Sequence, residues 1–90
     1  MPTRQITLTN KLGLHARAAA KFVGIANRHG CTVHIGRSTE ALVDGKNIMQ
    51  VMMLAASCGT EVCVSCEGEQ AEQAMHELIG LIEDRFGEGE

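Results

Sequence analysis

A histidine and an arginine stand two residues apart where a loop gives way to a helix. In the segment Gly13-Leu14-His15-Ala16-Arg17 the glycine favours a loop, and the alanine-rich run after it favours a helix. His15 is therefore expected to be the N-cap of this helix. The first backbone N–H groups, those of Ala16, Arg17 and Ala18, then have no partner within the helix. These donors and the positive end of the helix dipole form a site for an anion.

The chemistry that such a site supports is phosphoryl transfer. The helix dipole disfavours a positive charge on the His15 ring, which keeps the ring nucleophilic near neutral pH. The guanidinium of Arg17 matches the oxygens of a phosphate group. A nucleophilic histidine, backbone donors and an arginine can together accept a phosphoryl group and hold it. The alternative is that His15 only caps the helix and Arg17 is a solvated charge.

Charge is distributed unevenly along the 90 residues. Residues 1–39 contain six Lys and Arg and no acidic residue, whereas residues 40–90 contain all eleven Asp and Glu. One basic face is expected, suited to a phosphate group or an acidic protein partner. The formal net charge of −3 and the absence of Trp and Tyr argue against binding to nucleic acid. No apolar run approaches the ~20 residues of a membrane span, so we expect a cytoplasmic protein without membrane contact.

The elements that must position His15 follow from hydrophobic periodicity. The first helix should run from Ala16 to about Arg28 and end at Gly30, a residue suited to a left-handed C-cap. The order βαββαβα predicts an α+β open-faced β-sandwich, a four-stranded antiparallel sheet with three helices packed on one face. We expect a single domain over residues 1–90 with a polar tail at 87–90. The remaining predicted elements are strands at 3–9, 31–35, 41–43 and 61–67 and helices at 48–55 and 70–86.

The methionine-rich segment 48–55 is apolar on most sides, which predicts a mostly buried helix. Asn47 is a suitable N-cap for this helix. Met52 is the methionine expected to enter the core. Because no apolar stripe is left over once the core is assigned, we expect a monomer.

Four cysteines suggest a metal or redox site, above all the pair Cys63 and Cys66. Residues i and i+3 of a strand point to opposite faces of a sheet, so these two thiols cannot bind one ion together. Buried free thiols are the expected state, and we expect neither a metal nor another cofactor. A thiol or metal module is the alternative, which the substitution Cys63→Ser would test.

The segment Gly13-Leu14-His15-Ala16-Arg17 resembles the active-site signature of HPr, the histidine phosphocarrier family of the bacterial phosphotransferase system. Nearly the whole chain takes part, because the element order matches and residues 46–54 are similar to the regulatory-helix segment of that family. The resemblance implies that enzyme I phosphorylates His15 on Nδ1, that Arg17 steadies the phosphate, and that an enzyme IIA accepts it. It also implies a docking surface that includes Arg17, Lys21, Met49 and Gln50. Such a carrier turns over only within a relay and is no stand-alone catalyst.

Two positions depart from the pattern of the family. Ala18 stands where most HPr proteins have proline, and alanine preserves the first helical turn. Asn47 stands where many carry a regulatory serine, and its amide caps a helix but cannot accept a phosphate. Residues 10–23 most resemble NPr, the paralogue of the nitrogen-related branch. The alternatives are a general sugar-transport HPr and a binding regulator that uses the same surface without phosphoryl transfer.

Overall fold

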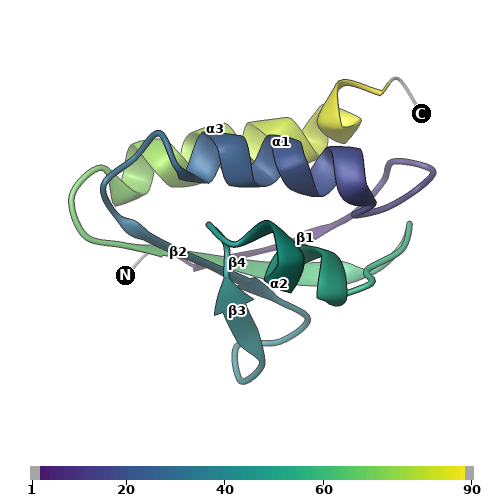
Figure 1. The fold of residues 1–90 in the computed structure, drawn as a ribbon, viewed down its shortest axis with the longest axis horizontal. Helices are drawn as coiled ribbons and strands as arrows, with labels where there is room; N and C mark the ends of the chain where they lie inside the picture. Colours follow the sequence, from purple (N-terminus) through teal and green to yellow (C-terminus); the bar gives the residue numbers. More distant parts are fainter. Residues whose placement is uncertain (1–2, 89–90) are drawn as a thin grey trace.

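Four strands and three helices follow one another in the order βαββαβα along residues 3–88, the part of the chain that this computed structural model describes (Figure 1). The strands form one antiparallel sheet in the order β1-β4-β2-β3, as the α+β prediction required. None of the helices within residues 3–88 is long and apolar enough to cross a membrane. The elements are β1 Thr3–Thr7, α1 Ala16–Ala26, β2 Thr32–Gly36, β3 Leu42–Asp44, α2 Ile48–Met53, β4 Glu61–Glu67, α3 Ala71–Glu83 and the 3-10 turn η1 Arg85–Gly87.

The core lies between the sheet and the helices. Figure 1 shows α1 and α3 side by side over the sheet, with the shorter α2 next to α1. Alternate residues of β4 point toward the helices, so Val62, Val64 and Cys66 belong to the buried cluster. Phe22 from α1 and Leu78 from α3 meet them there. This alternation confirms the period-2 pattern predicted for residues 61–67.

All three helices end earlier than the sequence predicted, and α2 ends at Met53 instead of Ala55. The N–H of Asn27 donates to the carbonyl of Val23, and the next two N–H groups make i to i−3 bonds that close α1. Gly30 is consequently not the left-handed cap, and α1 ends at Ala26. α3 ends at Glu83 instead of Phe86, because Arg85 and Phe86 have φ of 54° and 55° and cannot continue a right-handed helix.

The left-handed turn after α3 is stabilised by contacts of Phe86. Each non-glycine residue in this region costs about 1–2 kcal/mol, and Arg85 and Phe86 are two such residues. The Phe86 ring is fully buried, which contributes roughly 1.5–3 kcal/mol. Lys21 Nζ also donates to the Phe86 carbonyl over 2.6 Å, a charged hydrogen bond worth about 1.5–3 kcal/mol. The turn therefore holds the end of the described chain against α1.

The prediction of a mostly buried second helix is wrong. Only Val51 of α2 is buried, whereas Met52 is 37% exposed, Met49 63% and Met53 78%. A helix of six residues makes less than two turns, so only one position can face the core fully. Val51 takes that position in place of Met52. An apolar strip is therefore left over, which removes the reason given for expecting a monomer.

Candidate functional site

The loop before α1 is fixed by a close backbone contact. Gly13 has φ of 65°, and a Cβ atom at this residue would lie 2.5 Å from the Ala56 carbonyl oxygen. Only glycine fits such an approach. The N–H of Leu14 donates to the same Ala56 oxygen over 2.8 Å, and the side chain of Asn10 donates to the Gly13 carbonyl over 2.7 Å. These contacts fix the position of His15, the residue that follows this loop.

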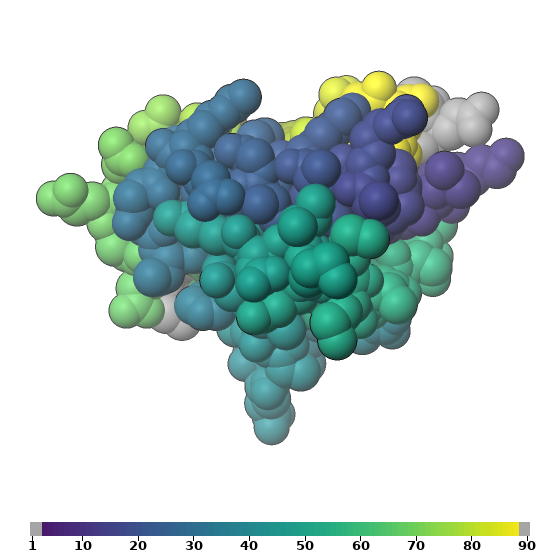
Figure 2. Space-filling model, viewed as in Figure 1, coloured from purple at the N-terminus to yellow at the C-terminus, as the bar shows by residue number. Residues whose placement is uncertain are grey.

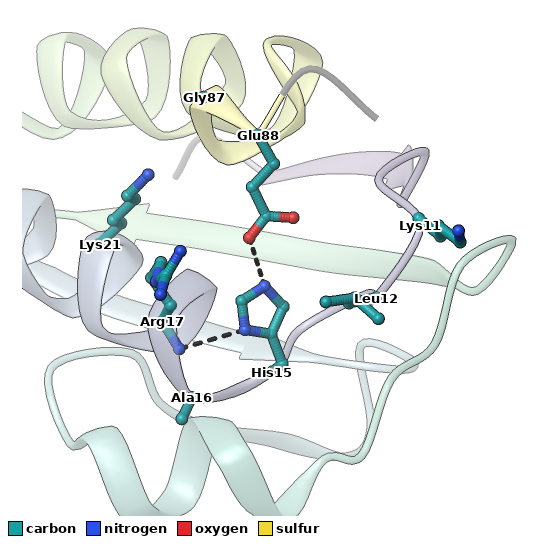
Figure 3. Close-up of a pocket in the computed structure, with 8 residues that line it drawn as sticks. All are labelled: Lys11, Leu12, His15, Ala16, Arg17, Lys21, Gly87 and Glu88. Atoms are coloured by element: carbon teal, nitrogen blue, oxygen red, sulfur yellow. Dashed lines mark hydrogen bonds and ion pairs between the residues drawn. The ribbon is translucent and has the colours of Figure 1, made fainter.

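That residue is His15, the N-cap of α1 as predicted. Its backbone is extended, and its Nδ1 accepts a hydrogen bond from the N–H of Arg17 over 3.2 Å. Its Nε2 contacts the carboxylate of Glu88 (Figure 3). A ring nitrogen that accepts from an amide carries the lone pair, so the ring proton belongs to Nε2. The side chain is 25% exposed and its ring remains accessible from outside.

A hollow on the surface surrounds the ring and is basic. Figure 3 shows Arg17 and Lys21 on one side of the ring and Leu12 and Lys11 on the other. Three cations around a helix N-terminus attract an anion, and this is the basic face that the charge distribution predicted. The complete lining is Lys11, Leu12, His15, Ala16, Arg17, Lys21, Gly87 and Glu88.

Glu88 is the acidic member of this hollow, and no pattern in the sequence indicated its role. Its Oε1 accepts from the side chain of Asn10 over 3.1 Å, and its Oε2 contacts His15. The hydrogen bond from Asn10 is the main cause that lowers the pKa of Glu88, and partial desolvation opposes it. The hydrogen bond to His15 and the electrostatic attraction of His15 and Lys21 lower this pKa further. The carboxylate is therefore ionised at neutral pH.

The backbone donors predicted at the helix start differ in their surroundings. Ala16 lines the hollow, whereas Ala18 is fully buried. The N–H of Arg17 is directed at Nδ1 of His15, and the exposed Arg17 side chain extends into the hollow. Lys21 lines the hollow too, but its ammonium group already donates to the Phe86 carbonyl.

The predicted residues of the second helix also lie at the surface. Asn47 caps α2, since its Oδ1 accepts from the N–H of Gln50 over 3.1 Å. The side chain of Gln50 is bound in turn, because its Oε1 accepts from the N–H of Asp44 over 2.9 Å. All three residues are exposed, and Met49 is 63% exposed although its side chain is apolar.

A shallow groove joins His15 to the second helix. Leu12 and Ala16 lie on the side of His15, and Met52 and Ala55 lie on the side of α2. Figure 2 shows α2, in teal, directly beside the start of α1 on this face. The exposed apolar residues gather here, and we call them the apolar surface: Leu12, Ile48, Met49, Met52 and Met53. A contiguous exposed apolar patch of this kind marks an interaction site.

The structure confirms that Cys63 and Cys66 point to opposite faces of the sheet. Of the four thiols expected to be buried, Cys58 is exposed instead, because it lies in the surface turn after α2. Cys66 belongs to the core, where burial raises the pKa of its thiol to about 11, with Cys31 beside it. The thiol of Cys63 instead accepts from Gln5 on the other face of the sheet. No group of three or more His, Cys, Asp or Glu within residues 3–88 is placed to hold a metal ion.

The fold and the site together define a small α+β protein that presents a histidine at a helix N-terminus. The family model described as "PTS HPr component phosphorylation site" matches residues 2–84. The chain belongs to this family. It is 59% identical to the phosphocarrier protein HPr of Pseudomonas aeruginosa over all 90 residues of both chains. It is 36% identical to the HPr-like protein Crh of Bacillus subtilis over 84 residues, which are 93% of this chain and 98% of Crh.

Solved structures agree with this membership. The crystal structure of HPr-C-His from Thermoanaerobacter tengcongensis superposes with a TM-score of 0.91. It is 40% identical in sequence, and the match covers 98% of both chains. The HPr of Bacillus anthracis superposes with a TM-score of 0.83 at 33% identity, covering 90% of this chain and 95% of that one. The open-faced β-sandwich predicted from the order of the elements is thereby confirmed.

Proposed function

We propose that this chain is a phosphocarrier in which His15 accepts a phosphoryl group from enzyme I and passes it to an enzyme IIA. The observation that carries the proposal is that Nδ1 of His15 accepts a hydrogen bond from the N–H of Arg17 at a helix N-terminus inside a basic hollow. Membership of the HPr family supports the same role. The reaction belongs in the cytoplasm, where phosphoenolpyruvate supplies the phosphoryl group.

The residues around His15 can share the work of the transfer. The lone pair of Nδ1 forms the new N–P bond while the bond between phosphorus and the donor's leaving atom breaks. The hydrogen bond from the N–H of Arg17 to Nδ1 is long at 3.2 Å, and this N–H is free to bind a phosphoryl oxygen once Nδ1 is occupied. The Arg17 guanidinium and the backbone of Ala16 lie beside it and favour the same negative charge.

Partner proteins would dock on the apolar surface next to His15. The groove between Leu12 and Met52 connects that surface to the ring, so a partner seated there brings its own reactive group to Nδ1. Adaptable methionines suit a surface that must bind enzyme I and an enzyme IIA in turn. All four residues predicted for docking are exposed, and two of them, Lys21 and Gln50, also have hydrogen-bond partners within the chain.

We place the chain in the nitrogen-related branch, where the acceptor is a regulatory enzyme IIA. Support comes from the likeness of residues 10–23 to NPr. Asn47 supports a lack of kinase control, because an amide that caps α2 offers no hydroxyl for phosphorylation. The competing assignment is a general carrier of the sugar branch. Parallel phosphorylation by the enzyme I of each branch discriminates the two, since the cognate enzyme should be faster.

Intact mass after incubation with phosphoenolpyruvate and enzyme I tests the carrier. One added phosphate is expected on the native chain, and the modification should be labile in acid. The variant His15→Ala should gain none, while circular dichroism confirms that it folds. If neither enzyme I adds mass to the native chain, the phosphocarrier is refuted and a regulator that acts by binding alone is favoured. Retention of the biological effect by His15→Ala would favour that regulator as well.

A further inference from the structure

The carboxylate of Glu88 touches the one ring nitrogen of His15 that the transfer leaves unused. We propose that Glu88 is a positioning residue, which holds the ring proton on Nε2 and so keeps Nδ1 available as the nucleophile. This inference rests on the proposed phosphocarrier function. The sequence placed Glu88 in a polar tail, but the structure brings it onto the reactive histidine.

Contacts from separate parts of the chain place this carboxylate. Asn10, fully buried in the loop before α1, donates its side-chain N–H to Oε1 of Glu88. Lys21 of α1 holds the carbonyl of Phe86, and the Phe86 ring is buried in the core. The left-handed conformation of residues 85–87 turns the chain back toward His15. Contacts with Asn10, and those of Lys21 and the buried Phe86 ring, therefore determine the position of Glu88.

The two contacts of the ring demand the same tautomer. A neutral imidazole has one N–H group and one lone pair, and they lie on different nitrogens. An amide donor faces Nδ1, which therefore needs the lone pair, and an ionised carboxylate faces Nε2, which therefore needs the proton. A carboxylate that holds the far nitrogen of a histidine in this way fixes both the tautomer and the orientation of the ring. Glu88 and the N–H of Arg17 consequently both favour the tautomer that has its proton on Nε2.

The phosphoryl transfer needs no proton to move, because the proton on Nε2 of His15 stays there throughout. The lone pair of Nδ1 forms the bond to phosphorus, and the electron pair of the broken bond leaves with the donor. Because Nε2 keeps its proton, the phosphorylated ring carries a positive charge. The negative charge of Glu88 lies against that nitrogen and stabilises the charge as it develops. The return step to the acceptor reverses each of these changes.

Substitutions of Glu88 separate this role from simple packing. Both carboxylate oxygens accept a hydrogen bond, one from Asn10 and one from His15, and the single oxygen of a glutamine cannot serve both. E88Q and E88A should therefore both disturb the ring. E40Q removes the same charge from an exposed residue between β2 and β3 and serves as the matched control. Ring 15N chemical shifts report the tautomer of His15, and quenched-flow mass analysis reports phosphoryl acceptance from enzyme I.

We expect both Glu88 variants to increase the Nδ1–H population and to slow acceptance by roughly two- to fivefold, a modest loss because the pair borders solvent. E40Q should match the native chain in both readouts. Unchanged tautomers and rates in E88Q and E88A would overturn the proposal while the phosphocarrier stands. Faster acceptance would also overturn it, because the carboxylate would then exclude the donor. If the native chain accepts no phosphate, the proposed function fails, and the 15N shifts alone decide whether Glu88 sets the tautomer.

Discussion

Replacement of Phe86 by alanine tests whether the turn after α3 belongs to the folded core. Phe86 is near the end of the described chain and has a left-handed backbone, two features that usually go with a frayed terminus. In this structure its ring is nevertheless fully buried, like that of Phe22 in the middle of α1. The two phenylalanines therefore form a matched pair, one in a regular helix and one in a strained turn.

The expected loss follows from burial. Removal of a fully buried phenylalanine ring costs about 3–5 kcal/mol of the free energy of unfolding. A chain of this length has a total of roughly 5–13 kcal/mol, so Phe86→Ala should remove a large part of it. The midpoint of thermal unfolding should fall by at least about 12 °C. Phe22→Ala should cause a loss of similar size.

Urea unfolding followed by circular dichroism measures both variants against the native chain. A lower midpoint at an unchanged m-value identifies a true loss of stability. A change below about 1 kcal/mol for Phe86→Ala, together with a full loss for Phe22→Ala, would refute the reasoning and show that the turn detaches at little cost. Phe86→Leu retains most of the buried volume and should lie between the native chain and Phe86→Ala.

Three further outcomes are expected. Val51→Ala should lower the free energy of unfolding by about 1.5–3 kcal/mol, as urea unfolding would show. Met52→Ala should lower it by less than about 1 kcal/mol and should instead weaken the docking of enzyme I, as titration calorimetry would show. Asn10→Ala should raise the pKa of Glu88 toward its ordinary value, because the Asn10 bond is the main cause of the lowering. Because the pKa of Glu88 is lowered in the folded chain, the stability that its contact with Asn10 contributes is complete at pH values above the ordinary pKa of a glutamate. This contribution is lost as the pH falls through the lowered pKa, and 13C titration of the carboxyl group measures that pKa. Iodoacetamide should modify the native chain at Cys58 alone and all four cysteines after unfolding, as mass analysis would show.

The sequence predicted those parts of the site that depend on local interactions. The cap at His15 follows from a loop glycine and an alanine-rich helix, and Asn47 caps α2 for equally local reasons. β4 was predicted to the residue because alternation within a strand records which face is buried. Each of these features needs information from only a few neighbouring positions.

The parts that the sequence did not predict depend on contacts between distant segments. Glu88 reaches His15 because Phe86 enters the core and Lys21 holds its carbonyl, and no local pattern records either contact. The choice of Val51 over Met52 depends on the rotation of a very short helix against its neighbours. Leu12, an apolar residue between Lys11 and Gly13 in the loop before α1, was a local signal of the apolar surface that was missed.

The order of the strands has a consequence for when the molecule can fold. β4 lies between β1 and β2, although it follows both in the chain, and Thr3 pairs with Ser65 across 62 positions. During synthesis β1 and β2 therefore have no bridge between them until β4 has left the ribosome. Pairing over such separations is slow, because the intervening chain must be ordered before any contact forms. The core is thus completed late, because Val62 and Val64 of β4 belong to it, and a nascent chain that lacks β4 has no continuous sheet beneath the groove between His15 and α2.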